Sequence, residues 1–215
     1  MLTKYRTIHS FGSDEIIINK SRFIGYAKPI ISEDEAIAFI QEIKSKHKDA
    51  THNVYAYVFG ESNNIQRYSD DGEPSGTAGI PVLEVIKKED LRNVVVVVTR
   101  YFGGIKLGAG GLVRAYTKGA KIGLEAGLIV DKVLYKKMKF RIDYTLYGKV
   151  ENELLRLEYI ISDVIYDDAV NLIILCETEN TANLINLLTE LTSSRMTYEE
   201  IDEGYYSVKD NNIVK

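Results

Sequence analysis

The 215-residue chain has no tryptophan, one cysteine and three prolines. A single cysteine, Cys176, excludes an intramolecular disulfide and any metal site that needs several thiolates. No stretch approaches the ~18 uninterrupted apolar residues of a membrane-spanning helix, and the N-terminus carries no apolar signal segment. We therefore expect a cytoplasmic protein that has no membrane partner.

Charge is distributed unevenly, although the net charge is only −4. Residues 87–149 carry 14 Lys and Arg against 5 Asp and Glu, whereas residues 150–215 carry 4 against 14. The basic middle fits either a solvated face or an anion-binding surface. The acidic tail is a candidate docking face for a protein partner.

The stretch 68–116 contains two of the three prolines and eight of the 16 glycines, so its backbone path is constrained. Its five consecutive valines, Val94 to Val98, have no polar face, which predicts a strand covered on both sides. This strand leads through residues 100–102 into a glycine-rich loop at 103–111. An acidic loop at 69–74 lies upstream. We expect the buried strand to place the cationic, glycine-rich loop near the carboxylates of the acidic loop. These two loops form our candidate site.

The first 134 residues have the pattern of an α+β domain. Apolar alternation predicts strands at 5–11, 15–18, 23–31, 53–59 and 94–101. The first two of these are expected to form a hairpin with its turn at residues 12–14. Helices are predicted after the capping residue Ser32, at 77–89 and at 108–126.

From residue 135 the pattern restarts with strands at 136–144, 160–166, 169–176 and 196–201. Helices are predicted at 147–158 and 181–191. The order βαββαβ is that of a ferredoxin-like domain. We therefore expect an α+β protein with two domains, 1–134 and 135–215.

The glycine loop has two interpretations, a tight strand-to-helix turn or a site for an anion such as RNA phosphate. It is not a Walker A loop, because Ala109 and Gly110 stand where Lys and Ser or Thr are needed. The dinucleotide fingerprint also fails, since Val113 stands where Gly or Ala is needed. The candidate anion- or nucleic-acid-binding residues are Arg100, Tyr101, Lys106, Gly108, Gly110, Gly111, Arg114 and Lys118.

The candidate catalytic residues are His52, Asp70, Asp71 and Glu73. The three carboxylates fit a turn, since Asp-Asp-Gly and Glu-Pro are ordinary turn sequences. They also fit a hard-cation site, an acid/base pair, or salt bridges to Arg67 or Arg100. An EF-hand spacing is absent, and we assign no metal and no cofactor. His52 is more typical of a structural hydrogen bond than of catalysis.

Two motifs resemble a known family: YSDDGEPSGTAGIP at 68–81 and VVVTRYFGGIKLGAGGLVRAY at 96–116. Together with Thr51-His52-Asn53 they look like the signature of the IMPACT/YigZ family, over residues 20–125 and more loosely over the tail. The resemblance implies an N-terminal domain similar to ribosomal protein S5 domain 2, with a left-handed βαβ crossover. It also implies a C-terminal domain like domain V of elongation factor G.

Eukaryotic relatives in this family regulate translation, and both implied folds occur in proteins that work at the ribosome. We therefore expect a protein that binds RNA or the ribosome and is linked to regulation of translation. One alternative is an enzyme acting on an anionic or phosphorylated small molecule, with Asp70, Asp71 or Glu73 as base or Mg²⁺ ligand. Another is an interaction adaptor that docks a partner through the acidic C-terminal domain.

Overall fold

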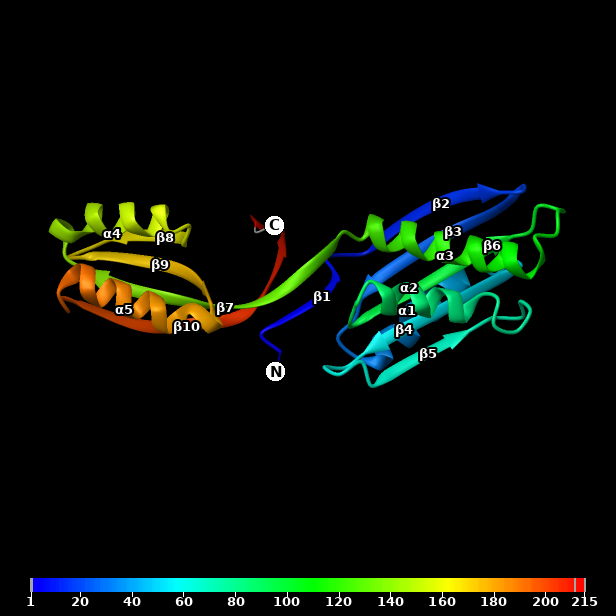
Figure 1. Cartoon of the computed structure of the whole chain (residues 1–215), viewed down its shortest axis with the longest axis horizontal. Coiled ribbons are helices and arrows are strands. Elements are labelled where there is room, and N and C mark those ends of the chain that lie inside the picture. The colour runs from blue at the N-terminus through cyan, green and yellow to red at the C-terminus, as the bar shows by residue number, and fades with distance from the viewer. Residues whose placement is uncertain (1, 211, 215) are drawn as a thin grey trace. The chain divides into compact units, whose positions relative to one another are not determined.

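The computed structural model describes residues 2–210 and 212–214 and divides the chain into two compact units (Figure 1). Of the described residues, the first unit comprises 5–131, 207–210 and 212–214, and the second comprises 2–4 and 132–206. Residues 207–210 and 212–214, expected in the second domain from the sequence, thus cluster with the first unit. A hydrogen bond between His9 Nδ1 and Ser207 Oγ, 2.9 Å long, ties this segment to the first unit.

The first unit is built on an antiparallel sheet with the strand order β2-β3-β6-β4-β5. These strands are β2 (Gly12–Ile18), β3 (Ser21–Pro29), β4 (His52–Phe59), β5 (Ile65–Ser69) and β6 (Val94–Tyr101). The valine strand β6 is the central one, as its composition predicts. Strand β5 is not predicted from the sequence, because this edge strand is largely exposed and lacks an apolar alternation.

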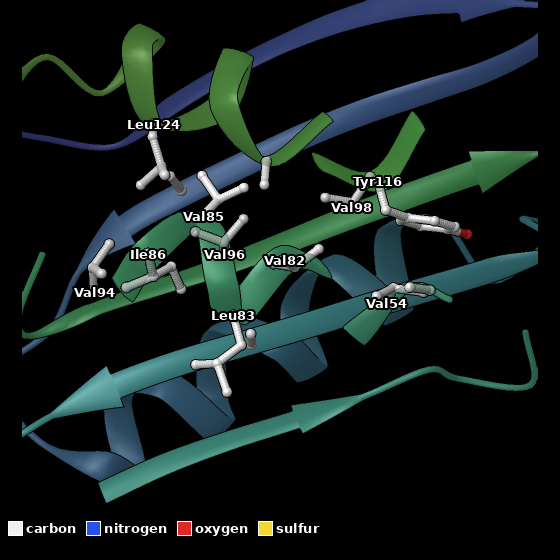
Figure 2. Close-up of a cluster of buried hydrophobic side chains, with 14 of the residues drawn as sticks. Val54, Val82, Leu83, Val85, Ile86, Val94, Val96, Val98, Tyr116 and Leu124 are labelled. Carbon is white, nitrogen blue, oxygen red and sulfur yellow. The ribbon is translucent and has the colours of Figure 1, made fainter. Parts of the chain in front are cut away.

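Helices cover both faces of this sheet. Helix α1 (Glu33–Lys46) packs on one face, where Val95 and Val97 point, and Ser32 caps its N-terminus as predicted. Helices α2 (Gly79–Lys88) and α3 (Gly108–Ala126) pack on the other face, against Val94, Val96 and Val98 (Figure 2). All five valines are fully buried. The prediction of a strand covered on both sides is confirmed, because alternate side chains of β6 enter two separate cores.

The two helical crossovers of this sheet have opposite hands. The connection β3-α1-β4 and the connection β5-α2-β6 each join two parallel strands that flank one antiparallel strand. With the joined strands pointing up, both connections advance in the same direction across the sheet. Because α1 and α2 lie on opposite faces, one crossover is left-handed, against the usual right-handed rule. A left-handed crossover is what the family resemblance implies for this domain.

The predicted hairpin between the first two strands is wrong. Strand β1 (Lys4–Ile8) pairs with β7 (Ile129–Ile142), not with β2. Strand β2 instead forms a hairpin with β3 around Asn19 and Lys20, whose φ angles are 46° and 64°. Two central residues with positive φ make a tight turn that matches the twist of the flanking strands.

The second unit has the predicted order β7-α4-β8-β9-α5-β10, and the α+β class is confirmed. Its further elements are α4 (Tyr144–Arg156), β8 (Ile160–Tyr166), β9 (Val170–Glu177), a 3₁₀ turn (Thr178–Asn180), α5 (Thr181–Thr192) and β10 (Met196–Lys209). The strand order β10-β7-β9-β8 continues at β10 into the short strand β11 (Asn212–Ile213). Alternate residues of β7 and β9, such as Phe140 and Leu172, pack in one core with Leu154 of α4 and Leu184 of α5.

Glycines let α3 approach β3 closely, and this contact generates a stability prediction. A Cβ added at Gly25 would lie 1.9 Å from the carbonyl oxygen of Gly119 on α3. We expect Gly25→Ala to lower the free energy of unfolding by about 3 kcal/mol or more, because backbone must move. Gly110→Ala is the control, since a Cβ there has open space within 4 Å. Urea denaturation measures both, and equal midpoints for the two variants would contradict this close contact between α3 and β3.

Candidate functional site

The acidic loop is a tight turn, which is one of the interpretations that its sequence allows. The amide of Glu73 donates to the carbonyl of Asp70 over 3.0 Å. The two central residues, Asp71 and Gly72, have φ angles of 48° and 88°. Such a turn with two positive φ values suits Asp followed by Gly.

The carboxylate of Asp70 caps helix α2. Its oxygens accept hydrogen bonds from the amides of Gly76 (2.9 Å), Ala78 (3.1 Å) and Gly79 (2.8 Å). Ala78 itself occupies the N-cap position and has no capping side chain. A carboxylate at a helix N-terminus is favourable because free amides and the helix dipole meet it there. Asp70 therefore has a structural role that explains the missing local cap.

Asp71 joins the acidic loop to α1 and β4. Its carboxylate lies 2.6 Å from Lys44 Nζ and accepts a 2.7 Å hydrogen bond from the amide of Asn53. Its carbonyl lies 2.8 Å from Nδ1 of His52. The role of Lys44 is not predicted from the sequence, because no local pattern connects a helical lysine with a loop that lies 27 residues away.

Glu73 is the centre of a buried polar cluster. Its Oε1 lies 2.6 Å from Nη1 of Arg100 and accepts a 2.7 Å hydrogen bond from the hydroxyl of Tyr116. Nε2 of the partly exposed His52 lies 3.7 Å from the same oxygen. The Glu73 side chain is 3% exposed and that of Arg100 is 6% exposed. Of the two salt-bridge partners considered from sequence, Arg100 is the one that Glu73 contacts.

Strand pairing places these groups together. His52 on β4 and Phe23 on β3 are the register partners of Arg100 on β6. The Arg100 guanidinium carbon lies 5.4 Å from the ring centre of Phe23 and 5.4 Å from that of Phe102. Cation–π contacts of this kind stabilise a cation that has left water. Within the described part of the chain, Arg100 Nε is buried and has no hydrogen-bond partner.

This position of Arg100 corrects the role that the sequence suggests for it. A phosphate contact requires an accessible guanidinium, whereas Arg100 is buried and paired with Glu73 inside the first unit. A buried ion pair of this type is strongly destabilised when one partner is removed, because the remaining charge loses its compensation. Arg100 therefore holds the acidic loop on β6 and does not reach solvent.

The environment of Tyr116 keeps its hydroxyl protonated. Burial raises the pKa of Tyr116 well above its ordinary value, and the hydrogen bond to the Glu73 carboxylate raises it further. Tyr116 therefore remains a hydrogen-bond donor to Glu73 at neutral pH. The helical periodicity of the sequence places Tyr116 on a buried face but indicates no polar partner for it.

Tyr101 and Phe102 diverge at the end of β6. The Tyr101 hydroxyl lies 2.8 Å from Nδ1 of His47, beside helix α1 and on the opposite face from Arg100. The Phe102 side chain is 47% exposed. The structure therefore separates Tyr101 from the glycine loop and leaves Phe102 as the accessible aromatic residue of this pair.

The glycine loop and the first half of α3 present exposed cations. Lys106, Arg114 and Lys118 are exposed, and no ion pair is found for them among residues 2–210 and 212–214. Helix α3 begins after Leu107 without a capping side chain and without an acidic residue in its first turn. The amides of Gly108, Gly110 and Gly111 lie in this first turn, where free N–H groups and the helix dipole favour an anion.

The described residues contain neither a cluster of metal-binding side chains nor a membrane-spanning helix. Among them, no group of three or more His, Cys, Asp or Glu side chains has an arrangement that could hold a metal ion. No helix in the described part of the chain is long and apolar enough to cross a membrane.

The buried cluster around Glu73 predicts that replacing this one carboxylate by an amide strongly lowers the free energy of unfolding. Glu73→Gln removes the charge that compensates Arg100, and we expect it to lower the free energy of unfolding by about 3–5 kcal/mol. Glu84→Gln is the matched control, because the exposed pair of Glu84 with Lys87 should contribute less than about 1 kcal/mol. Urea denaturation followed by circular dichroism measures both variants. Similar urea midpoints for the two variants would show that the buried pair of Glu73 and Arg100 does not contribute to stability.

The raised pKa of Tyr116 predicts how stability depends on pH. The unfolded chain loses the Tyr116 proton near pH 10, whereas the folded protein retains it, so the stabilisation is complete below about pH 10 and is lost above it. Tyr116→Phe lacks this ionisation. Between about pH 10 and 11.5, its free energy of unfolding should fall less steeply with pH, by up to about 1.4 kcal/mol per pH unit. Equal slopes for the variant and the wild type in urea denaturation would contradict this assignment.

Comparison with known proteins places this architecture in a family. The Impact N-terminal domain matches residues 19–124, and a domain of unknown function (DUF1949) matches residues 140–195. IMPACT family member YvyE of Bacillus subtilis is 45% identical over 99% of this chain and 98% of its own length. IMPACT family member YigZ of Escherichia coli is 34% identical over 66% of this chain and 74% of its own length.

A solved structure called "Crystal structure of an hypothetical protein" covers 94% of this chain and 99% of its own, with a TM-score of 0.59 and 27% identity. The matched domains cover both the acidic and the glycine loops and most of the second unit. Because YvyE is 45% identical to this chain over nearly the whole length of both, the chain belongs to the IMPACT family.

Proposed function

We propose that this protein binds RNA, free or within the ribosome, and that it takes part in the regulation of translation in the cytoplasm. The binding site is the α3 basic surface, which we define as Lys106, Arg114, Lys118 and the amides of residues 108–111. Phe102 adds an accessible ring beside it. The observation that carries the proposal is that these three cations are exposed on the glycine loop and the first half of α3, whose N-terminus is uncapped, without ion pairs in the part of the chain that the structure describes.

The chemistry of this surface favours phosphate. Lys and Arg side chains together with backbone amides at a helix N-terminus are the groups that contact phosphate oxygens in nucleic-acid complexes. Arg114 and Lys118 are four residues apart and therefore project from the same side of α3. An exposed ring such as Phe102 is able to stack on a base without sequence preference. The expected binding is therefore dominated by charge and depends strongly on salt.

The buried cluster has a supporting role in this proposal. Arg100 is fixed by Glu73 and lies two residues before Phe102, where the strand ends and the glycine loop begins. Fixing the end of β6 also fixes the direction in which the loop leaves the sheet. Arg100 thus positions the surface and is not one of its contacts. The link to translation rests on the ribosomal folds that the family resembles.

The alternative of an enzyme that acts on an anionic small molecule has less support. It requires Asp70, Asp71 or Glu73 as a base or a metal ligand. Each of these carboxylates is already engaged, by the α2 amides, by Lys44 and Asn53, or by Arg100 and Tyr116.

The adaptor alternative rests on the acidic C-terminal segment. In the second unit, Glu200 lies 2.7 Å from Lys136 and Glu199 lies 3.1 Å from Lys139. Part of this acidic charge is therefore neutralised by the basic strand β7, which weakens the electrostatic argument for a docking face.

Filter binding tests the RNA proposal. Labelled poly(U) and an RNA hairpin are titrated with the protein between about 50 and 200 mM salt, and sedimentation with purified ribosomes is measured in parallel. We expect Lys106→Ala with Arg114→Ala to weaken binding similarly for both RNAs. The loss of two phosphate contacts should reduce the slope of log K against log salt by about 1.4–1.8.

Lys48→Ala is the matched control, because Lys48 is an exposed lysine that follows α1 on the other side of the sheet. It should leave the affinity and the salt slope unchanged. The proposal fails if the wild-type protein retains neither RNA nor ribosomes at about 50 mM salt. It also fails if Lys48→Ala weakens binding as much as the double substitution.

A further inference from the structure

A groove of about 370 Å³ lies between α2 and α3, on the outer side of the two helices. From α2 it is lined by Ile80, Glu84 and Lys88, and from α3 by Val113, Thr117 and Lys121. In each helix these residues are four apart, so each set forms one stripe along its helix. The groove therefore extends along the helices for two turns or more, which is about 12 Å at 1.5 Å per residue.

The two ends of this groove differ in polarity. Helices α2 and α3 run in the same direction: Figure 2 shows Val82 of α2 and Tyr116 of α3 nearer one end, with Ile86 and Leu124 at the other. The N-terminal end of the groove therefore contains Ile80 and Val113, which are 39% and 38% exposed. The C-terminal end contains the exposed amines of Lys88 and Lys121.

The acidic residues that line the groove form ion pairs with residues outside it, whereas the two lysines that line it do not. Glu84 lies 2.7 Å from Lys87, and Glu89 lies 3.4 Å from Arg6, so both acidic lining residues already have cationic partners. For Lys88 and Lys121, no ion pair is found in the part of the chain that the structure describes. The C-terminal end of the groove therefore carries two lysines without ion-pair partners, about two helical turns from the apolar residues at the N-terminal end.

We propose that this groove binds a small aliphatic carboxylate, with its hydrocarbon body along Ile80 and Val113 and over Val85, which also lines the groove, and its carboxylate between Lys88 and Lys121. Burial of the hydrocarbon provides the affinity, at about 25 cal/mol per Å² of apolar surface removed from water. The two amines and the Thr117 hydroxyl provide the preference for an anionic head group.

The size of the groove favours a small molecule over a protein segment. Small-molecule sites occupy about 300–1,000 Å³, and this groove is near the lower limit of that range. A specific protein interface buries more than about 1,000 Å² in total, which a groove of two helical turns does not supply by itself. The proposal is independent of RNA binding, because neither Lys88 nor Lys121 belongs to the α3 basic surface.

Titration with decanoate tests the proposal, with decan-1-ol and decylammonium as probes of equal chain length and different head group. Calorimetry gives the affinities, and amide NMR shifts locate the site. We expect decanoate to bind at least 10-fold more tightly than the other two probes and to shift α2 and α3 resonances. Lys88→Ala with Lys121→Ala should weaken decanoate at least 10-fold and leave decan-1-ol unchanged.

Two further variants test whether decanoate binds in the groove and not elsewhere on the protein surface. Val113→Glu places a charge on the apolar wall at a partly exposed position, and it should abolish binding while the circular dichroism spectrum stays native. Lys48→Ala should leave the affinity for decanoate unchanged. The proposal is overturned if decan-1-ol or decylammonium binds as tightly as decanoate. It is equally overturned if an acidic amphipathic peptide shifts these resonances and decanoate does not.

Discussion

The ion pair between Glu73 and Arg100 connects three segments of the first unit that are distant in the sequence. Its 2.6 Å contact lies in the interior, and the Tyr116 hydroxyl of α3 donates to the same carboxylate oxygen. Neither charge is stable in the interior alone, since removing an ion from water costs several kcal/mol. The acidic loop, the central strand β6 and helix α3 must therefore assemble together, and the other features of the site depend on that assembly.

This constraint determines which side chains reach solvent. Because Arg100 is held inside between Phe23 and Phe102, the cations available to a ligand are those of the loop and helix that follow. Alternation along β6 then directs Tyr101 to the α1 face, where it contacts His47. The buried Glu73 and Arg100 stabilise the fold, whereas the lysine and arginine side chains on the outer side of α3 are exposed to solvent. The residues that stabilise this motif are thus different from its exposed cations.

In the second unit, folding also changes what the charges along the sequence suggest. Along the sequence, a basic segment is followed by an acidic one, and each by itself suggests a charged docking face. In the sheet, β7 lies beside β10, so Lys136 and Lys139 of the basic segment meet Glu200 and Glu199 of the acidic one. Adjacent strands of opposite charge neutralise each other, and the charge left for a partner is smaller than a count along the chain indicates.

The sequence by itself determined the features that depend on neighbouring residues. The valine run predicted a strand with two covered faces, Ser32 predicted the start of α1, and apolar periodicity predicted the βαββαβ order of the second unit. Tertiary structure alone decided the partner of β1, the hand of each crossover and the choice of Arg100 over Arg67 as the partner of Glu73. The physical reason is that periodicity reports which face of an element is buried, whereas strand pairing and buried ion pairs depend on segments brought together only by folding.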